Sequence, residues 1–125
     1  MIDKKESVED YLEKILMLKE KNEIVRAVDI SNFMSFSKAS VSIALKKLIS
    51  YGYVMVDKDS GNVSLTDKGL ERAKNTYSRH LILTDLFENL GVSKENAVHD
   101  ACKIEHDLSE ETFDALTELN NSLKK

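Results

Sequence analysis

The stretch that decides the fold is residues 28–65, which read VDISNFMSFSKASVSIALKKLISYGYVMVDKDSGNVSL. Apolar residues recur at helical spacing over residues 28–34 and again from about Lys38 to Tyr51. Between these segments, residues 35–37 form a polar turn. In the second helix we expect inward positions for Val41, Ala44, Leu45, Leu48 and Ile49. Two helices joined by a short turn predict a helix-turn-helix.

The residues after the second helix predict a β-hairpin. Gly52 is suited to the C-terminal end of a helix. Residues 53–57 alternate between the two faces of a strand, a polar loop containing Gly61 follows, and residues 63–65 supply a second short strand. A helix-turn-helix followed by a hairpin predicts a winged helix-turn-helix, whose second helix lies in the DNA major groove while the wing contacts the backbone.

Helices flank this stretch on both sides. We expect a first helix that opens at Ser7, with Asp10 as its capping partner, and runs to about Glu20. After the hairpin the pattern predicts three more helices, over about residues 67–90, from Ser93 to about residue 108, and after a cap at Ser109. The predicted fold class is therefore mainly α with a small β-hairpin wing.

The helical pattern also suggests two domains and a dimer. We assign residues 1–72 to a winged helix-turn-helix domain and residues 73–125 to a helical domain. The last helices carry more apolar residues than so small a lobe needs, and a homodimer interface is the simplest use for the surplus.

Charge and cysteine content narrow the function classes. The net charge is −4. From Arg26 to Lys74, however, there are 8 Lys/Arg against 5 Asp/Glu, and from Arg79 to Lys125 there are 5 against 10. A basic middle beside an acidic end fits one part that faces phosphates and another that collects cations. The single cysteine excludes an internal disulfide. With no apolar run of membrane-spanning length and no signal-peptide pattern, we expect a cytoplasmic protein without a membrane partner.

Residues of the predicted helix-turn-helix and wing suit contacts with double-stranded DNA. Short hydroxyl side chains and a helix N-terminus bind phosphate, an alanine packs on a thymine methyl group, and lysines attract the DNA backbone. The alternative is merely a serine-rich helix start. The candidate DNA-binding residues are Arg26, Ser37, Lys38, Ala39, Ser40, Ser42, Lys46, Lys47 and Lys58.

A second pattern, near the C-terminus, suits a metal ion. Cys102, Glu105 and His106 are spaced i, i+3 and i+4, which brings a thiolate, a carboxylate and an imidazole onto one helix face. His99 extends that face by a turn. These are ligand types for a divalent transition metal. The alternative is a buried cysteine, a solvated glutamate and a hydrogen-bonded histidine.

Three further residues are candidate ligands. Asp10 and Glu13 lie one helical turn apart, although acidic residues in a first turn also stabilise the helix dipole. His80 lies on the predicted long helix, where a lone histidine is often a satisfied core residue. Two half-sites on different helices suggest that metal binding ties the N-terminal part to the C-terminal part. Catalytic motifs are absent: there is no glycine-rich phosphate loop, no G-x-S-x-G and no H-E-x-x-H.

Taken together, these pieces resemble the diphtheria toxin repressor and manganese transport regulator family of metal-dependent repressors, in its short two-domain form. The resemblance spans nearly the whole chain. The matching segments are residues 7–13, residues 28–30, residues 39–42, Lys47-Leu48, residues 65–69, Arg79-His80 and residues 104–109.

The resemblance implies a homodimer that binds a palindromic DNA operator when metal is bound. By position, Asp10, Glu13, His80, Glu105 and His106 match ligands of the manganese-type branch. Cys102 departs from that branch, which has glutamate there, and matches the iron-type branch. Asp10 departs from the iron-type branch, which has methionine. His99 resembles a second-site histidine of the iron-type branch, but its spacing to Cys102 is one residue shorter.

These observations predict a metal-dependent transcriptional repressor that controls metal uptake and homeostasis genes. Oxygen ligands suit Mn²⁺ or Fe²⁺, whereas the Cys102 thiolate favours Fe²⁺, Co²⁺ or Zn²⁺. We expect Fe²⁺ or Mn²⁺, with Co²⁺, Ni²⁺ and Zn²⁺ as ions that bind in vitro. Two alternatives remain: a winged-helix regulator not gated by metal, and a small metal-binding module or enzyme without DNA binding.

Overall fold

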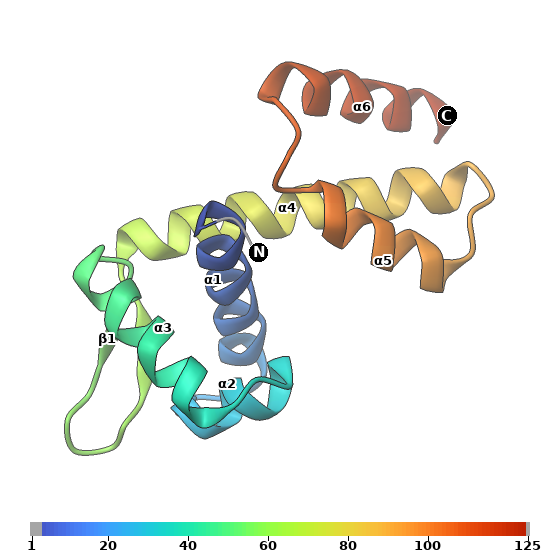
Figure 1. Cartoon of the computed structure of the whole chain (residues 1–125). Coiled ribbons are helices and arrows are strands. Elements are labelled where there is room, and N and C mark those ends of the chain that lie inside the picture. Colours follow the sequence, from blue (N-terminus) through green and yellow to red (C-terminus); the bar gives the residue numbers. More distant parts are fainter. Residues whose placement is uncertain (1–3, 125) are drawn as a thin grey trace. The chain divides into compact units, whose positions relative to one another are not determined.

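The computed structural model describes residues 4–124, which form six helices and one two-stranded sheet (Figure 1). These residues group into two compact units, an N-terminal unit up to Lys74 and a C-terminal unit from Asn75. The helices are α1 (Lys4–Lys21), α2 (Ala27–Met34), α3 (Lys38–Ser50), α4 (Asp67–Asn89), α5 (Lys94–Ile104) and α6 (Glu110–Leu123). The strands are β1 (Val54–Val56) and β2 (Val63–Leu65).

The N-terminal unit is a winged helix-turn-helix, as predicted. Helices α2 and α3 pack together at the end of α1, and the hairpin lies beside α3 (Figure 1). The strands pair antiparallel, with Val54 opposite Leu65 and Val56 opposite Val63. The apolar residues expected on the inner faces form one core, whose buried members include Leu12, Ile15, Val25, Ile30, Val41, Leu45, Leu48, Val54 and Val63.

Side chains at the base of the wing fix it to the segment before α2. The Asn62 Oδ1 atom accepts hydrogen bonds from the Val25 N–H (2.9 Å) and from Lys19 Nζ (3.0 Å). At the tip, Asp57 Oδ2 accepts from the N–H and the hydroxyl of Ser60, and these bonds lower the pKa of Asp57. Hydrogen bonds from its own side chains therefore stabilise the wing loop.

The C-terminal unit contains the second part of α4 together with α5 and α6. Ser93 and Ser109 cap α5 and α6 through their hydroxyl groups, as the sequence predicted. A polar chain holds α6 against α4. Asn89 donates to Asn120 (2.8 Å), and Asn120 donates to Asp85 (2.9 Å).

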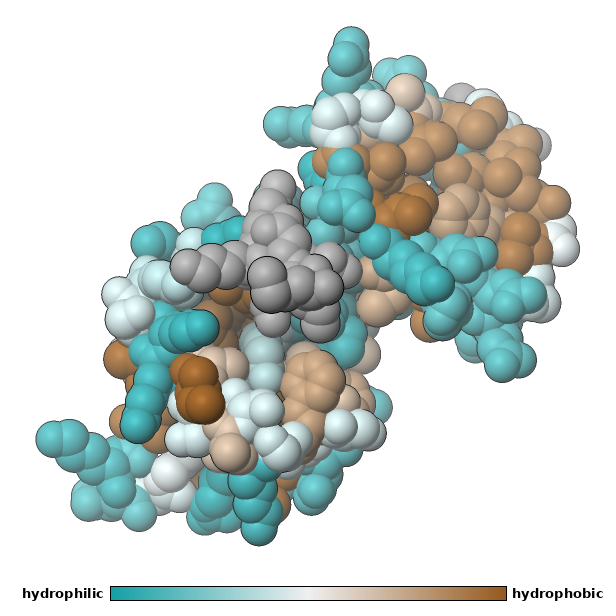
Figure 2. Space-filling model, in the orientation of Figure 1, coloured by the Kyte–Doolittle hydropathy of each residue, from teal (hydrophilic) through white to brown (hydrophobic). Residues whose placement is uncertain are grey.

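Large apolar side chains reach the surface of the C-terminal unit. Figure 2 shows hydrophobic residues gathered over this part of the molecule. The exposed large apolar residues of the unit are Leu81, Leu90, Val92, Val98, Leu119 and Leu123. Exposed patches of this kind on a small lobe mark a surface for association.

Three details differ from the sequence predictions. Helix α1 already includes Lys4, because lysine and glutamate are good helix formers, and Ser7 therefore lies inside the helix and does not open it. Helix α5 ends at Ile104, not near residue 108. Ile49 is 46% exposed in the last turn of α3, where Leu48 takes the buried position.

Candidate metal centre and candidate nucleic-acid interface

Glu105 is the centre of a buried polar cluster in the C-terminal unit. Its side chain is 0% exposed. The Oε2 atom lies 2.8 Å from Nδ1 of His80, and the Oε1 atom lies 3.5 Å from Nε2 of His106. The interpretation of Glu105 as a solvated charge is therefore wrong. A carboxylate between two imidazoles is a donor set that suits a divalent transition metal.

Cys102 belongs to the same cluster. Its Sγ atom lies within 4.8 Å of a carboxylate oxygen of Glu105, and its side chain is partly buried. Helix α5 carries Cys102 in its last turn, and Glu105 follows as the C-terminal cap with helical backbone angles. The expected i, i+3 relationship thus survives although the helix ends one residue before Glu105.

Arg79 of α4 fixes the turn that carries the ligands. Its guanidinium donates to the backbone carbonyls of Glu105 (3.2 Å) and Leu108 (2.8 Å). It also lies 5.0 Å from the centre of the Phe113 ring on α6. These contacts satisfy one carbonyl at the C-terminal cap of α5 and one in the turn that follows. This role of Arg79 was not predicted, because no local sequence pattern links Arg79 to a turn so far along the chain.

His99, the fourth residue of the predicted face, is placed apart from the cluster. Its side chain is 65% exposed and lies 3.5 Å from the carboxylate of Asp100. The structure therefore brings together His80, Cys102, Glu105 and His106, and it does not bring His99 among them.

The two acidic residues on α1 have unlike environments. Asp10 is partly buried, whereas the Glu13 side chain is 1% exposed. Lys14 Nζ lies 2.7 Å from Glu13 Oε1 and 3.8 Å from Asp10 Oδ1. Because α1 already includes Lys4, both carboxylates lie beyond its first turn, where the helix dipole has little effect. The dipole explanation for these residues is therefore weakened.

Glu13 also has an oxygen that needs a partner. The Oε2 atom is buried and accepts no hydrogen bond from the described residues. A buried carboxylate oxygen without a donor is costly, and a bound cation removes that cost. The acidic residues of α1, like the cluster around Glu105, have the donor chemistry of a divalent cation site. Beside them, burial and the charge of Asp10 raise the pKa of Tyr11.

Helix α3 presents the candidate nucleic-acid interface in the N-terminal unit. It contains three lysines and no acidic residue. Ser37 is its N-cap, because the hydroxyl accepts a hydrogen bond from the Ser40 N–H (3.1 Å). The residues predicted to contact DNA from this helix are all exposed: Lys38, Ala39, Ser40, Ser42, Lys46 and Lys47.

The wing supplies two further cations. Lys58 is exposed in the hairpin loop. Arg26, just before α2, is also exposed, but its Nε atom donates to the Ser60 carbonyl of the wing (2.8 Å). Arg26 therefore stabilises the wing loop with one nitrogen and leaves the rest of its guanidinium at the surface. Together with α3, these residues give the basic surface that a phosphate backbone requires.

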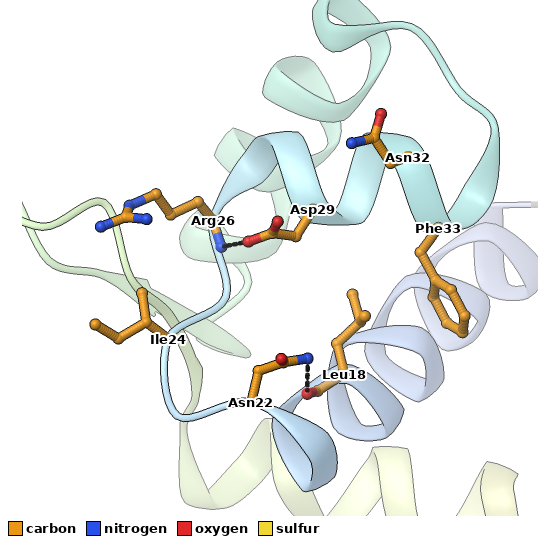
Figure 3. A pocket seen from close by; sticks show the side chains of 7 residues that line it. All are labelled: Leu18, Asn22, Ile24, Arg26, Asp29, Asn32 and Phe33. Carbon is orange, nitrogen blue, oxygen red and sulfur yellow. Dashed lines mark hydrogen bonds between the residues drawn. The ribbon is translucent and has the colours of Figure 1, made fainter.

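A groove of about 520 Å³ lies between the end of α1 and α2. Figure 3 shows Leu18 and Asn22 on one side of it and Asn32 and Phe33 on the other. The Asp29 carboxylate accepts a hydrogen bond from the Arg26 N–H and so caps the N-terminus of α2. With one arginine and one aspartate in its lining, the groove has no excess charge and adds nothing to the basic surface.

No helix among residues 4–124 combines the length and the apolar character needed to cross a membrane.

Comparison with family models covers nearly the whole chain. The model described as the iron dependent repressor N-terminal DNA binding domain matches residues 4–62. The model described as the iron dependent repressor metal binding and dimerisation domain matches residues 66–125.

Individual relatives agree with these models. An HTH-type transcriptional regulator of Methanocaldococcus jannaschii is 37% identical over 113 residues, which cover 89% of this chain and 90% of the relative. The HTH-type transcriptional regulator MntR of Geobacillus thermodenitrificans is 35% identical, over 90% of this chain and 79% of the relative. The solved structure of the manganese regulator SloR has a TM-score of 0.78 at 33% identity. The match covers 91% of this chain but 53% of SloR, so the chain spans about half of that structure.

Proposed function

This chain belongs to the family of iron-dependent repressors, whose members are metal-dependent transcriptional regulators and not enzymes, and we propose that it represses iron or manganese uptake and homeostasis genes when a divalent metal is bound. The observation that carries the proposal is the buried Glu105 carboxylate between His80 and His106. One carboxylate and two imidazoles buried in a helical unit fit the binding of a regulatory metal.

The proposed metal ligands come from both units. They are Asp10 and Glu13 on α1, together with His80, Cys102, Glu105 and His106. Buried acidic side chains in each unit support this set, because a positive ion offsets their charge. When bound, the ion supplies positive charge that ligands from two segments share, and this favours one arrangement of the ligand-bearing helices. His99 is exposed and lies apart from the Glu105 cluster, so it remains a candidate ligand of a second metal site.

DNA binding is proposed to use α3 and the wing. Helix α3 would enter the major groove with its N-terminal residues near base edges. Lys46, Lys47 and Lys58 would neutralise phosphates. We propose a palindromic operator, because a two-fold symmetric homodimer presents two identical recognition helices.

The homodimer itself is supported by the C-terminal unit. That unit matches a model described as a dimerisation domain, and its exposed leucines and valines need a partner surface. A repressor must share a compartment with the DNA that carries its operator. We therefore expect the protein in the cytoplasm.

The choice between Fe²⁺ and Mn²⁺ depends on Cys102. A thiolate is softer than a carboxylate and favours Fe²⁺, Co²⁺ or Zn²⁺ over Mn²⁺. The relative SloR is a manganese regulator, whereas the matching family models are described as iron dependent. If Cys102 is a ligand, Cys102→Glu should shift relative affinity toward Mn²⁺ and remove the thiolate charge-transfer band of the Co²⁺ form. A native Co²⁺ spectrum without that band would exclude Cys102 as a ligand.

The proposed function is tested by gel shift on the promoter of the protein's own gene. The expected result is a retarded complex with Fe²⁺ under anaerobic conditions or with Mn²⁺, and none with a chelator. A duplex of scrambled sequence serves as the control. Equal retardation with metal and with chelator would overturn metal gating, and no retardation in any condition would overturn DNA binding.

A further inference from the structure

Ile43 is a large apolar side chain on a helix that also exposes lysines and serines. It is 57% exposed, and no large apolar residue in the described part of the chain is more exposed. It follows Ser42 and lies on the outer side of α3, because Val41 and Leu45 on either side of it are buried in the core. Ile43 therefore contributes little to the fold of the N-terminal unit.

The neighbours of Ile43 on the helix surface indicate the kind of partner it meets. Ala39 lies four residues before it, and Lys46 and Lys47 lie three and four residues after it, so all four share one side of α3. All four are exposed, and α3 carries no acidic residue. A polyanion is the partner that matches this charge.

The chemistry of the isoleucine side chain indicates which group of the polyanion it contacts. Its side chain neither donates nor accepts a hydrogen bond, so it cannot read the polar base edges. In the major groove the C5-methyl group of thymine is the apolar feature. The β-branched side chain is also restricted in its χ1 angle within a helix, so it presents a fixed shape.

We propose that Ile43 is a specificity-determining residue that packs on the C5-methyl group of a thymine in each half of the operator. The proposal rests on the proposed function, because it requires α3 to lie in the major groove. It goes beyond that function in naming the base and the atom that this side chain recognises.

The test removes the methyl group from DNA and the side chain from the protein in a double-mutant cycle. The probe is a duplex selected by the Mn²⁺-loaded protein from a random-sequence pool. Each thymine is then replaced in turn by deoxyuridine, which lacks only the C5-methyl group. Binding of the native protein and of Ile43→Ala is measured by fluorescence anisotropy with Mn²⁺.

One symmetric pair of thymines should give the predicted signature. Losing a buried methyl group should weaken native binding about fourfold per half-site, from the transfer free energy of one buried carbon. Ile43→Ala should bind the thymine duplex more weakly than the native protein does, and should show no further loss on the deoxyuridine duplex. The matched control is Ile49→Ala, because Ile49 is 46% exposed on a different side of α3. It should keep the full sensitivity to deoxyuridine.

Other outcomes contradict the proposal in distinguishable ways. If Ile43→Ala keeps the native sensitivity at every thymine, Ile43 does not contact a methyl group. If Ile43→Ala instead changes the dimer equilibrium in sedimentation, the side chain belongs to a protein interface and the proposal is wrong. Neither result contradicts the proposed function, provided that Mn²⁺ still stimulates DNA binding by the native protein. If the native protein binds no duplex, both proposals fail together.

Discussion

The Nδ1 atom of His80 lies 2.8 Å from the Oε2 atom of Glu105, and the two side chains are 16% and 0% exposed. This contact joins α4 to the turn after α5. It places an imidazole and a carboxylate together in a unit that buries few large apolar side chains, Leu83 and Leu86 among them. Burying a charged side chain costs free energy, and this cost is offset when the charge is paired or binds a cation. The proposed metal site of the C-terminal unit is based on this contact.

Arg79 should control metal affinity through the position of the ligand turn. Arg79→Met removes the donors to the carbonyls of Glu105 and Leu108 while keeping an apolar stem near Phe113. We expect Mn²⁺ affinity to fall roughly 10–100-fold, as for other residues that orient metal ligands. The measurement is the concentration of free Mn²⁺ by electron paramagnetic resonance. Arg79→Lys should recover part of the affinity, and Lys103→Met on exposed α5 surface should have no effect. Unchanged affinity in Arg79→Met would show that the turn is held without it.

The lysines of the proposed DNA surface should act independently of sequence. Replacing Lys46, Lys47 or Lys58 by alanine should weaken binding about equally on operator and scrambled duplexes. Each change should also lower the slope of log affinity against log salt by roughly one unit, because one phosphate contact is lost. Lys94→Ala, on α5 of the C-terminal unit, is the matched control. If none of the three variants differs from Lys94→Ala, the DNA contacts lie elsewhere.

Gly69→Ala should destabilise the protein although alanine favours helices. Helix propensity alone predicts a gain of about 1 kcal/mol for this change. A Cβ at Gly69, however, would lie 2.0 Å from the Tyr53 carbonyl oxygen, which is backbone and cannot easily move. Overpacking costs about 1–3 kcal/mol, so the steric effect should exceed the propensity gain. Urea unfolding compares Gly69→Ala with Lys74→Ala on the same helix. A Gly69→Ala protein as stable as the native one would contradict the close approach.

Asp85 should give the C-terminal unit a pH-dependent stability. Hydrogen bonds from Lys124 (2.8 Å) and Asn120 (2.9 Å) hold the pKa of Asp85 below its usual value of 3.8. Because the folded pKa is the lower one, the stabilisation is present above the unfolded pKa and is lost as pH falls through the folded pKa. The difference in thermal midpoint between the native protein and Asp85→Asn should be constant from about pH 7 to about pH 5 and shrink below about pH 4. A difference that stays constant to the acid limit would show that Asp85 is not stabilised in its ionised form.

Local sequence signals were sufficient for most of the N-terminal unit. The Ser37 cap, the break at Gly52 and the polar loop around Gly61 each act within a few residues, so the helix-turn-helix and hairpin could be placed from the sequence. Ser7 misled the prediction for α1, because a serine before a helical pattern resembles a cap whether or not the helix starts there.

Long-range contacts set the features that no local sequence pattern predicts. The turn after α5 is bound by Arg79, which lies on another helix and donates to two of its carbonyls. The grouping of Cys102 with Glu105 follows from helical spacing and was predictable. The approach of His80 to Glu105 cannot be derived from any local period, and only the family resemblance grouped these two residues. Helical spacing placed His99 on the face of Cys102, but its side chain is exposed.

The most direct test of the central claim is the affinity for Mn²⁺ measured with and without the promoter duplex. If metal and DNA binding are coupled, each ligand must raise the affinity of the other by the same factor. We predict that the duplex raises Mn²⁺ affinity of the native protein roughly 5–150-fold, and that Mn²⁺ raises DNA affinity equally. Glu105→Gln, which keeps the size of the buried side chain, should form a folded dimer with no such coupling. Equal Mn²⁺ affinity of the native protein with and without DNA, or full coupling in Glu105→Gln, would contradict the account.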